Sequence, residues 1–151
     1  MIRRVEEAGQ RPAVARCVLE ALTDWFGVEE SREAYIRDSR DMEMFAAFED
    51  GEPVGFACLR ETGAATVELA VMGVLREYHR RGLGRQLVRA AIDHARQAGY
   101  RFMQVKTVKM GVYEDYDATN RFYRSMGFQE FEVFPRLWDE ANPCQVYVMA
   151  L

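Results

Sequence analysis

The sequence lacks the patterns that mark several large classes of protein. No apolar run approaches the about 20 residues of a membrane-spanning helix, and the first residues contain no apolar signal-peptide core. The three cysteines, Cys17, Cys58 and Cys144, form no Cys-x-x-Cys pair, and with the histidines His79 and His94 they match no zinc spacing. We therefore expect a cytoplasmic protein with reduced thiols, no membrane attachment and no metal.

An overall positive charge is also missing. The net charge is −4, so the molecule as a whole does not attract nucleic acid, and any site for a polyanion must be local. The 151 residues, of which 49% are hydrophobic, suit one globular domain over residues 1–151. No repeat, low-complexity tract or linker divides it.

The N-terminal part of the chain alternates between the periods of helices and strands. Hydrophobic residues at helical spacing are followed by β-branched and aromatic residues around an Asp-Gly dipeptide, which suits a tight hairpin turn. The pattern predicts a strand at 2–6, a helix over 11–27 that ends at Gly27, a helix over 29–40 with Ser31 as a cap, and two strands on either side of Asp50 and Gly51.

The rest of the chain predicts a crossover unit and a final hairpin. We expect a strand over 65–75 that is buried on both faces near its end, a helix from Leu83 to Gly99, a parallel strand over 101–108, a helix capped by Asp117 and closed at Gly127, and strands over 128–134 and 144–151 around a loop at 135–143. The fold class is mixed α/β (α+β), a single domain with a twisted mixed sheet of six to seven strands flanked by four helices.

The stretch "EYHRRGLGRQL" carries the parts of a phosphate-binding site where a strand leads into a helix. A helix N-terminus exposes unpaired N–H groups and favours an anion. Gly82 and Gly84 have no Cβ, so a phosphate can approach the backbone closely, and Arg80, Arg81 and Arg85 add positive charge. The alternative is a tight turn with solvated arginines, and the loop alone does not decide between the two interpretations.

Other phosphate motifs are absent. No Gly-x-x-x-x-Gly-Lys-Ser/Thr string of a P-loop occurs, and Gly82-Leu83-Gly84 is not continued to the Gly-x-Gly-x-x-Gly of a dinucleotide fold. ATP and NAD are therefore disfavoured as ligands.

The stretch "VELAVMGVLREYHRRGLGRQLV" resembles the central motif of the GCN5-related N-acetyltransferase (GNAT) family. Its strand pattern, Glu-Leu-x-x-Leu-x-Val, is matched by Glu68, Leu69, Met72 and Val74, and its loop pattern, Arg/Gln-x-x-Gly-x-Gly/Ala, by residues 79–84. A later "FYRSMGF" supplies the family's tyrosine before Gly-Phe, which is Tyr123.

The sequence departs from the family pattern at four positions. His79 stands where Arg or Gln is usual, and Arg76 replaces a common proline. Tyr116 and Thr119 stand where the family often has Asn and Ala. The last two changes affect side chains near the expected pantetheine arm of the cofactor rather than the fold.

The resemblance implies an acetyltransferase that carries the acetyl group of acetyl-CoA to a primary amine of a small molecule or peptide by direct attack. Acetyl-CoA is then the co-substrate, with its diphosphate on the loop amides and its pantetheine along the strand. The cofactor-binding residues implied are Met72, Gly73, Val74, Arg80, Arg81, Gly82, Leu83, Gly84, Arg85 and Thr119.

Two residues are implied to be catalytic. Glu68 lies where family members carry a general base that acts directly or through water, and burial in an apolar strand raises the pKa of a carboxyl group toward neutrality. Tyr123 corresponds to the general acid, since an ordinary phenol stays protonated above the pKa of a thiol. The structural alternatives are a strand-edge glutamate paired with a neighbouring arginine, and a core aromatic beside Phe122 and Phe128.

The remaining candidates carry weaker signals. His94 lies near the apolar edge of its helix and suits a structural role, and a covalent role for Cys144 has no histidine in support. The resemblance also implies a place for an acidic, aromatic-lined mouth for a cationic amine. The segments where the family usually forms its acceptor site contain Glu29, Glu30, Asp139 and Glu140 with Trp25, Phe26 and Trp138.

Three functions remain open at this point. The first is the N-acetyltransferase, which the retention of Glu68 and Tyr123 favours. The second is an acyl-CoA sensor or partner module without turnover, which the changes at Tyr116 and Thr119 favour. The third is a local anion or RNA-phosphate site, which the acidic net charge disfavours. We expect no nucleic-acid partner, and the resemblance allows a homodimer.

Overall fold

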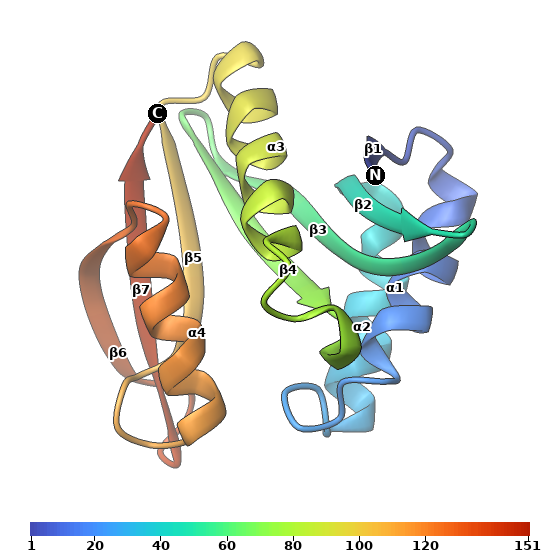
Figure 1. Cartoon of the computed structure of the whole chain (residues 1–151). Coiled ribbons are helices and arrows are strands. Elements are labelled where there is room, and N and C mark those ends of the chain that lie inside the picture. The colour runs from blue at the N-terminus through green and yellow to red at the C-terminus, as the bar shows by residue number, and fades with distance from the viewer. The chain divides into compact units, whose positions relative to one another are not determined.

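A computed structural model describes residues 1–151 and contains seven strands and four α-helices (Figure 1). In chain order these are β1 (Ile2–Arg4), α1 (Arg11–Leu19), α2 (Glu29–Asp38), β2 (Glu43–Glu49), β3 (Glu52–Gly63), β4 (Thr66–Val74), α3 (Leu83–Gln97), β5 (Phe102–Val108), α4 (Glu114–Ser125), β6 (Gln129–Asp139) and β7 (Asn142–Ala150). Single turns of 3-10 helix lie at Ala8–Gln10, Ser39–Asp41 and Arg76–Tyr78. The predicted mixed α/β class is confirmed.

The strands are hydrogen-bonded in the order β1-β2-β3-β4-β5-β7-β6. β2 pairs antiparallel with β1 and β3, and β7 pairs antiparallel with β5 and β6. β4 and β5 are parallel, with Thr66, Val67 and Glu68 opposite Phe102, Met103 and Gln104. The predicted crossover from β4 through α3 to a parallel strand is therefore confirmed.

The chain forms two compact units that we describe separately. The first consists of residues 1–60 and 69–94, and the second of residues 61–68 and 95–151. β4 belongs to both, because it passes from the second unit to the first after Glu68. The single domain expected over 1–151 stays a prediction.

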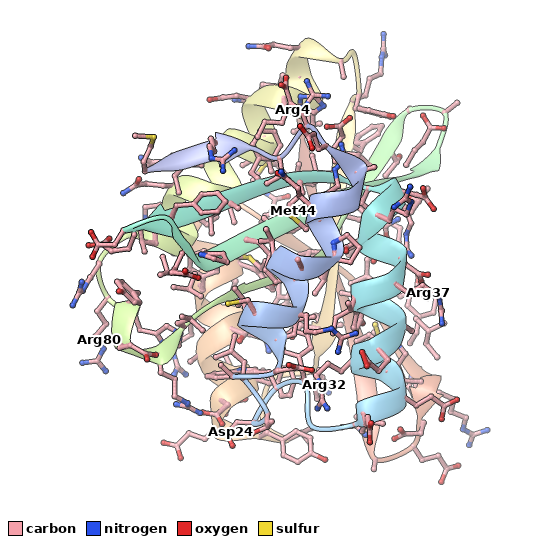
Figure 2. All side chains as sticks on the ribbon, turned by 90° about the vertical axis from the view of Figure 1, so that its right-hand side faces the viewer. Arg4, Asp24, Arg32, Arg37, Met44 and Arg80 are labelled. Carbon is pink, nitrogen blue, oxygen red and sulfur yellow. The ribbon has the colours of Figure 1, made fainter.

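The first unit has its core between the helices α1 and α2 and the strands β1 to β3. Val18 and Leu19 of α1 and Met44 of β2 are fully buried there, and Figure 2 shows the two helices side by side in front of the strand that carries Met44. The predicted stripe of α3 is confirmed, since Leu87, Val88, Ala91, Ile92 and Ala95 are all buried.

The first helix ends eight residues earlier than predicted. After Leu19 the backbone continues in turns, in which the N–H groups of Ala21 and Leu22 donate to carbonyl oxygens three residues back. Leu22 nevertheless stays buried and packs so closely on Gly73 that a Cβ there would come 2.8 Å from the Leu22 Cδ1 atom. Turns of this kind preserve the apolar spacing of a helix, which explains the wrong boundary.

The N-cap residues predicted for α2 and α4 are both wrong. Ser31 lies inside α2, which follows Val28, and Asp117 lies inside α4, which follows Tyr113. The Asp117 carboxylate instead accepts a 2.7 Å hydrogen bond from the backbone N–H of Gly111. Both helices begin earlier because acidic residues in their first turns interact favourably with the helix dipole.

Two predictions about strands are also wrong. The expected loop at 135–143 is mostly strand, because β6 continues to Asp139 and β7 begins at Asn142, whose backbone N–H and side-chain amide both donate to the Asp139 carboxylate. The buried residues of β4 include Val67, Glu68 and Leu69 near its start, whereas its last three residues are half-buried. The hairpin at Asp50 and Gly51 is confirmed, with φ angles of 51° and 81° that suit a type I′ turn.

A buried asparagine fixes α4 in the second unit, where Figure 1 shows the helix alongside β5 and β7. The Asn120 side-chain amide donates to the carbonyl oxygens of Val108 (2.8 Å) and Tyr116 (2.7 Å). Its oxygen accepts a 2.5 Å hydrogen bond from the Tyr147 hydroxyl. One fully buried side chain therefore joins the helix to both strands.

We predict that Asn120→Ala lowers the free energy of unfolding by about 2 to 4 kcal/mol, because it removes the buried acceptor of the Tyr147 hydroxyl and the side-chain donor to the Val108 carbonyl. Urea unfolding of the variant and of Arg121→Ala, its exposed neighbour on the same helix, measures the effect. Equal stabilities of the two variants would contradict the anchoring role.

Candidate functional site

The loop before α3 has the backbone of an anion site. Arg80 and Gly82 both have left-handed conformations, with φ angles of 63° and 77°. Gln86 donates its backbone N–H to the Gly82 carbonyl at 3.0 Å, which closes the first turn of the helix. The first N–H groups of a helix precede its regular backbone hydrogen bonds, and groups in this position commonly bind anions.

The arginines of this loop add charge at its surface. Arg80 and Arg81 are exposed, and Figure 2 shows Arg80 projecting away from the ribbon. The Arg81 guanidinium lies 4.9 Å from the centre of the Tyr78 ring, which holds it by a cation–π contact. Leu83, Gly84 and Arg85 are half-buried. The loop residues expected from the sequence thus lie together at one helix start.

His79 braces this loop against the end of β4. Its Nε2 atom lies 2.6 Å from the Val74 carbonyl oxygen, which requires a proton on that nitrogen. Its ring also meets the Trp25 ring edge-on, with ring centres 6.0 Å apart. His79, one of the residues that depart from the family pattern, therefore has a structural role.

Arg76 has a similar role in the same unit. It forms an ion pair with Asp24, and its guanidinium lies 4.6 Å from the centre of the Trp25 ring. Asp24 lies in the segment between α1 and α2 (Figure 2). The segment that follows α1 is thereby tied to the 3-10 turn before the loop.

The second unit holds a buried ion pair. Glu68 on β4 is 4% exposed, and its Oε1 atom lies 3.2 Å from the Nζ atom of Lys106 on β5. The register explains the contact, because Glu68 is opposite Gln104 and Lys106 lies two residues further along the same face of β5. The sequence allowed Glu68 to be a structural residue paired with an arginine. Glu68 does form an ion pair, but its partner is a lysine.

Cys144 lies on the same face as this ion pair. It is opposite Val108, two residues beyond Lys106, and its side chain is fully buried. Burial raises the pKa of the Cys144 thiol to about 11, an effect that Lys106 opposes and Glu68 reinforces. A thiol with this pKa is neutral near pH 7, which speaks against a covalent role.

Tyr123 belongs to the opposite side of these strands. It packs against Tyr147, which is opposite Val105 and therefore on the other face of β5 from Lys106. Its ring centre lies 5.8 Å from that of Phe128, and the residue is 6% exposed. Its position fits the expected core aromatic, and it also places a phenol on the α4 side of the strands.

The other expected residues have local partners. The Thr119 hydroxyl donates to the Asp115 carbonyl at 3.2 Å within α4, and Asp139 accepts hydrogen bonds from Asn142 in the β6–β7 turn. Glu140 lies 3.6 Å from Arg136, and the His94 ring meets Phe45 at 5.5 Å between ring centres. Glu29 and Glu30 are exposed in the first turn of α2.

Three residues that organise the second unit escaped the sequence analysis. Lys106 lies in an ordinary strand pattern, and its pairing with Glu68 depends on the β4–β5 register. Asn120 and Tyr147 are hydrogen-bonded although they lie 27 residues apart in the sequence. One signal was available for Asn120, because it lies three residues before Tyr123 on the apolar side of a predicted helix, and a buried polar residue requires partners.

Comparison with known proteins identifies the family. The model of the acetyltransferase (GNAT) family matches residues 14–128. The chain therefore belongs to the GNAT acetyltransferases, which confirms the resemblance.

Individual relatives agree with this assignment. The uncharacterised N-acetyltransferase YsnE of Bacillus subtilis is 26% identical over 102 residues, which are 68% of this chain and 66% of that protein. The match thus spans slightly less than two thirds of the relative.

Solved structures share the fold. A protein of the GNAT family from Desulfovibrio desulfuricans has a TM-score of 0.84 at 22% identity, over 99% of this chain and 98% of that one. A GNAT acetyltransferase from Elizabethkingia anophelis, with acetyl-CoA bound, has a TM-score of 0.74 at 17% identity, over 100% of this chain and 97% of that one. At these identities the likeness shows the fold alone.

Two further features of the structure concern metals and membranes. No group of three or more His, Cys, Asp or Glu side chains is placed to hold a metal ion. None of the helices is both long enough and apolar enough to span a membrane.

We predict that Cys144 resists alkylation at neutral pH. Because its pKa is raised to about 11, its thiolate fraction at pH 8 is small and increases about tenfold for each pH unit up to that value. Mass spectrometry after a short iodoacetamide pulse on the native protein should show modification of the exposed Cys17 and none of Cys144. Equal labelling of both cysteines at pH 8 would contradict the neutral thiol.

Proposed function

We propose that this protein transfers the acetyl group of acetyl-CoA to a primary amine of a small molecule or peptide. The observation that carries the proposal is the loop before α3, where left-handed residues at Arg80 and Gly82 directly precede the N-terminus of a 15-residue helix, which favours an anion. Membership of the acetyltransferase family supports acetyl transfer in general. The amine acceptor, a cytoplasmic location and a homodimer remain predictions.

The backbone would provide most of the cofactor contacts. In our proposal the N–H groups of residues 82–85 bind the diphosphate, with Arg80 and Arg81 adding charge. The backbone of Met72 and Val74 binds the pantetheine, and Gly73 between them packs on Leu22. Val74 already accepts a hydrogen bond from His79, so its carbonyl is oriented before the cofactor arrives.

An unpartnered hydroxyl in the second unit also fits a polar ligand. The Oγ1 atom of Thr107 is buried and has no hydrogen-bond partner. Its position opposite Gln145 puts it on the same face as Tyr147, the α4 side of β5. Buried hydroxyls in folded proteins almost always find a partner, so the Thr107 hydroxyl is available to a polar ligand of this unit.

The reaction that we propose is direct attack. A neutral amine attacks the thioester carbonyl, the new C–N bond forms, the C–S bond breaks, and the sulfur leaves as a thiolate that must take up a proton. Glu68 accepts the proton from the amine, directly or through water. Tyr123 donates a proton to the sulfur, since an ordinary phenol has a pKa of about 10 and a thiol one of about 8.5.

The ion pair with Lys106 is compatible with a base. In the pair the Glu68 carboxylate carries its negative charge, which is the form that accepts a proton. The Lys106 side chain is 28% exposed and that of Glu68 is 6% exposed. The lysine is therefore the more exposed member of the pair.

An acyl-CoA sensor without turnover is the second candidate. Thr119 stands where the family often has alanine, and its hydroxyl is used within α4 by the Asp115 carbonyl. Such a protein would bind acetyl-CoA through the same loop and release no thiol.

We predict that acetyl-CoA raises the melting temperature of the protein and that Gly82→Ala weakens its binding at least about tenfold. The φ of 77° at Gly82 is unfavourable for alanine, and distortion of the loop misaligns the amides. Gly51→Ala is a matched control, because Gly51 has a φ of 81° in the β2–β3 turn. Both variants should lose a similar stability, whereas only Gly82→Ala should lose affinity in thermal-shift and calorimetric titrations.

Two outcomes of this experiment would change the proposal. No stabilisation by acetyl-CoA would overturn acetyl-CoA as the co-substrate. Stabilisation without thiol release, tested over a panel of amines and peptides, would favour the sensor.

We predict that a substitution of Glu68 has an effect on turnover that depends on pH, whereas a substitution of Tyr123 has an effect at every pH. Glu68→Gln should slow turnover strongly near pH 7 and much less near pH 9.5, where more of the amine is already neutral. Tyr123→Phe should slow turnover at both pH values by about 10²-fold or more, because the thiolate loses its proton donor. Steady-state thiol release from pH 6 to 10 measures both effects.

Affinity for acetyl-CoA serves as the control for these variants. Both should bind acetyl-CoA as the wild type does, so that a change in rate reports on chemistry. An unchanged pH profile in Glu68→Gln would remove it from the mechanism, and full turnover by Tyr123→Phe would do the same for the phenol.

A further inference from the structure

The charges around Glu68 restrict the acceptors that it can serve. Its carboxylate is already paired with the Lys106 ammonium at 3.2 Å, inside a sheet where a charge without a partner is strongly destabilising. Gln104, on the same face, donates its amide to the Thr62 hydroxyl at 2.9 Å and is committed there. Any acceptor amine that approaches Glu68 therefore meets the lysine as well.

A plain cationic amine is a poor ligand for this arrangement. Its ammonium would compete with Lys106 for one carboxylate, and the two positive charges would repel each other. If it displaced the lysine, the Lys106 charge would lose its partner. The pair thus weakens the binding of acceptors that carry only a positive charge.

An acceptor with both charges avoids this penalty. We infer that the acceptor is a free α-amino acid, whose amine faces Glu68 and whose carboxylate faces Lys106. In this exchange Glu68 replaces the Lys106 ammonium by the ammonium of the amino acid. Lys106 replaces the Glu68 carboxylate by the carboxylate of the amino acid. The inference rests on the proposed function, because it takes Glu68 as the base of the acetyl transfer.

The choice of lysine at position 106 fits such an exchange. The chain contains 18 arginines and two lysines, and one of the two lysines is Lys106. An arginine fork binds a carboxylate bidentately, whereas an ammonium is a compact charge on a flexible stem and can turn from one carboxylate to another. The adjacent Cys144 is a neutral thiol near pH 7, so it adds no charge to this selection.

The charges also change in the direction that releases product. The bound ammonium first gives one proton to Glu68, which passes it to solvent, and the lone pair of the neutral amine then forms the C–N bond. The C–S electron pair goes to sulfur, which takes a proton from Tyr123, and solvent reprotonates the phenol. Glu68 takes the second proton from the nitrogen, which leaves a neutral amide. The product is an N-acetyl amino acid, which keeps its carboxylate but no longer has an ammonium. Glu68 then returns its proton to solvent, pairs again with Lys106 and competes with the product carboxylate.

The test compares acceptors that differ in one charge. Each of the common amino acids is assayed for thiol release beside its α-amide and its decarboxylated amine, with acetyl-CoA and the full-length wild-type protein. We expect the best amino acid to exceed its amide and its amine by at least about tenfold in kcat/KM. This comparison needs no variant, so it stands even where a substitution at Lys106 prevents folding.

Variants then assign the preference to the lysine. Lys106→Met should reduce kcat/KM for the amino acid and bring it within about threefold of its amide, and Lys106→Arg should restore part of the preference. Lys109→Met, at the exposed second lysine, is the matched control and should keep the wild-type ratio. Melting temperature and acetyl-CoA affinity check that each variant is folded.

Failure of the inference differs from failure of the proposed function. If amides and plain amines react as fast as amino acids, or if Lys106→Met slows all acceptors by the same factor, the amino-acid acceptor is overturned and the N-acetyltransferase stands. If no amine of any class releases thiol while acetyl-CoA binds, the proposed function itself fails.

Discussion

The second unit depends on how one buried carboxylate is neutralised. Glu68 lies in a strand whose neighbours are apolar, and a charge in that position is tolerated when a cation and hydrogen bonds accompany it. The parallel register of β4 and β5 supplies that cation, since it puts Lys106 on the same face within 3.2 Å. A shift of β5 by one residue would turn Lys106 to the α4 side and remove this cation from Glu68. The pairing of Glu68 with a cation therefore depends on the register of β4 and β5.

The loop of the first unit depends on backbone conformation in the same way. A non-glycine residue with a φ of 63° is destabilised by about 1 to 2 kcal/mol, so Arg80 must be held in place by its surroundings. His79, bonded to the Val74 carbonyl, and Arg76, paired with Asp24, fix the chain just before it. These contacts hold Arg80 in its strained conformation and so fix the orientation of the backbone amides that follow it. Amides fixed in this way would be pre-oriented for the anion that we propose.

Sequence reasoning succeeded where the signal was local. The hairpin at Asp50 and Gly51, the stripe of α3 and the glycines of the loop each follow from the conformational preferences of a few adjacent residues. It failed at the end of α1, where turns keep helical spacing, and at Asp117, whose carboxylate binds a preceding loop. It could not find Lys106 or Tyr147, because their partners come from distant segments and depend on register. The catalytic roles of Glu68 and Tyr123 remain predictions.

The family motif and the cation beside Glu68 come from different parts of the chain. The motif that resembles the family lies in β4 and the loop before α3, where the cofactor contacts that we propose come mainly from backbone amides, so many side chains would be compatible with it. The charge beside Glu68 comes from β5, outside that motif. In our proposal, a relative with the same loop but another residue at the position of Lys106 would accept a different amine, as expected when function resides in a site rather than in a fold.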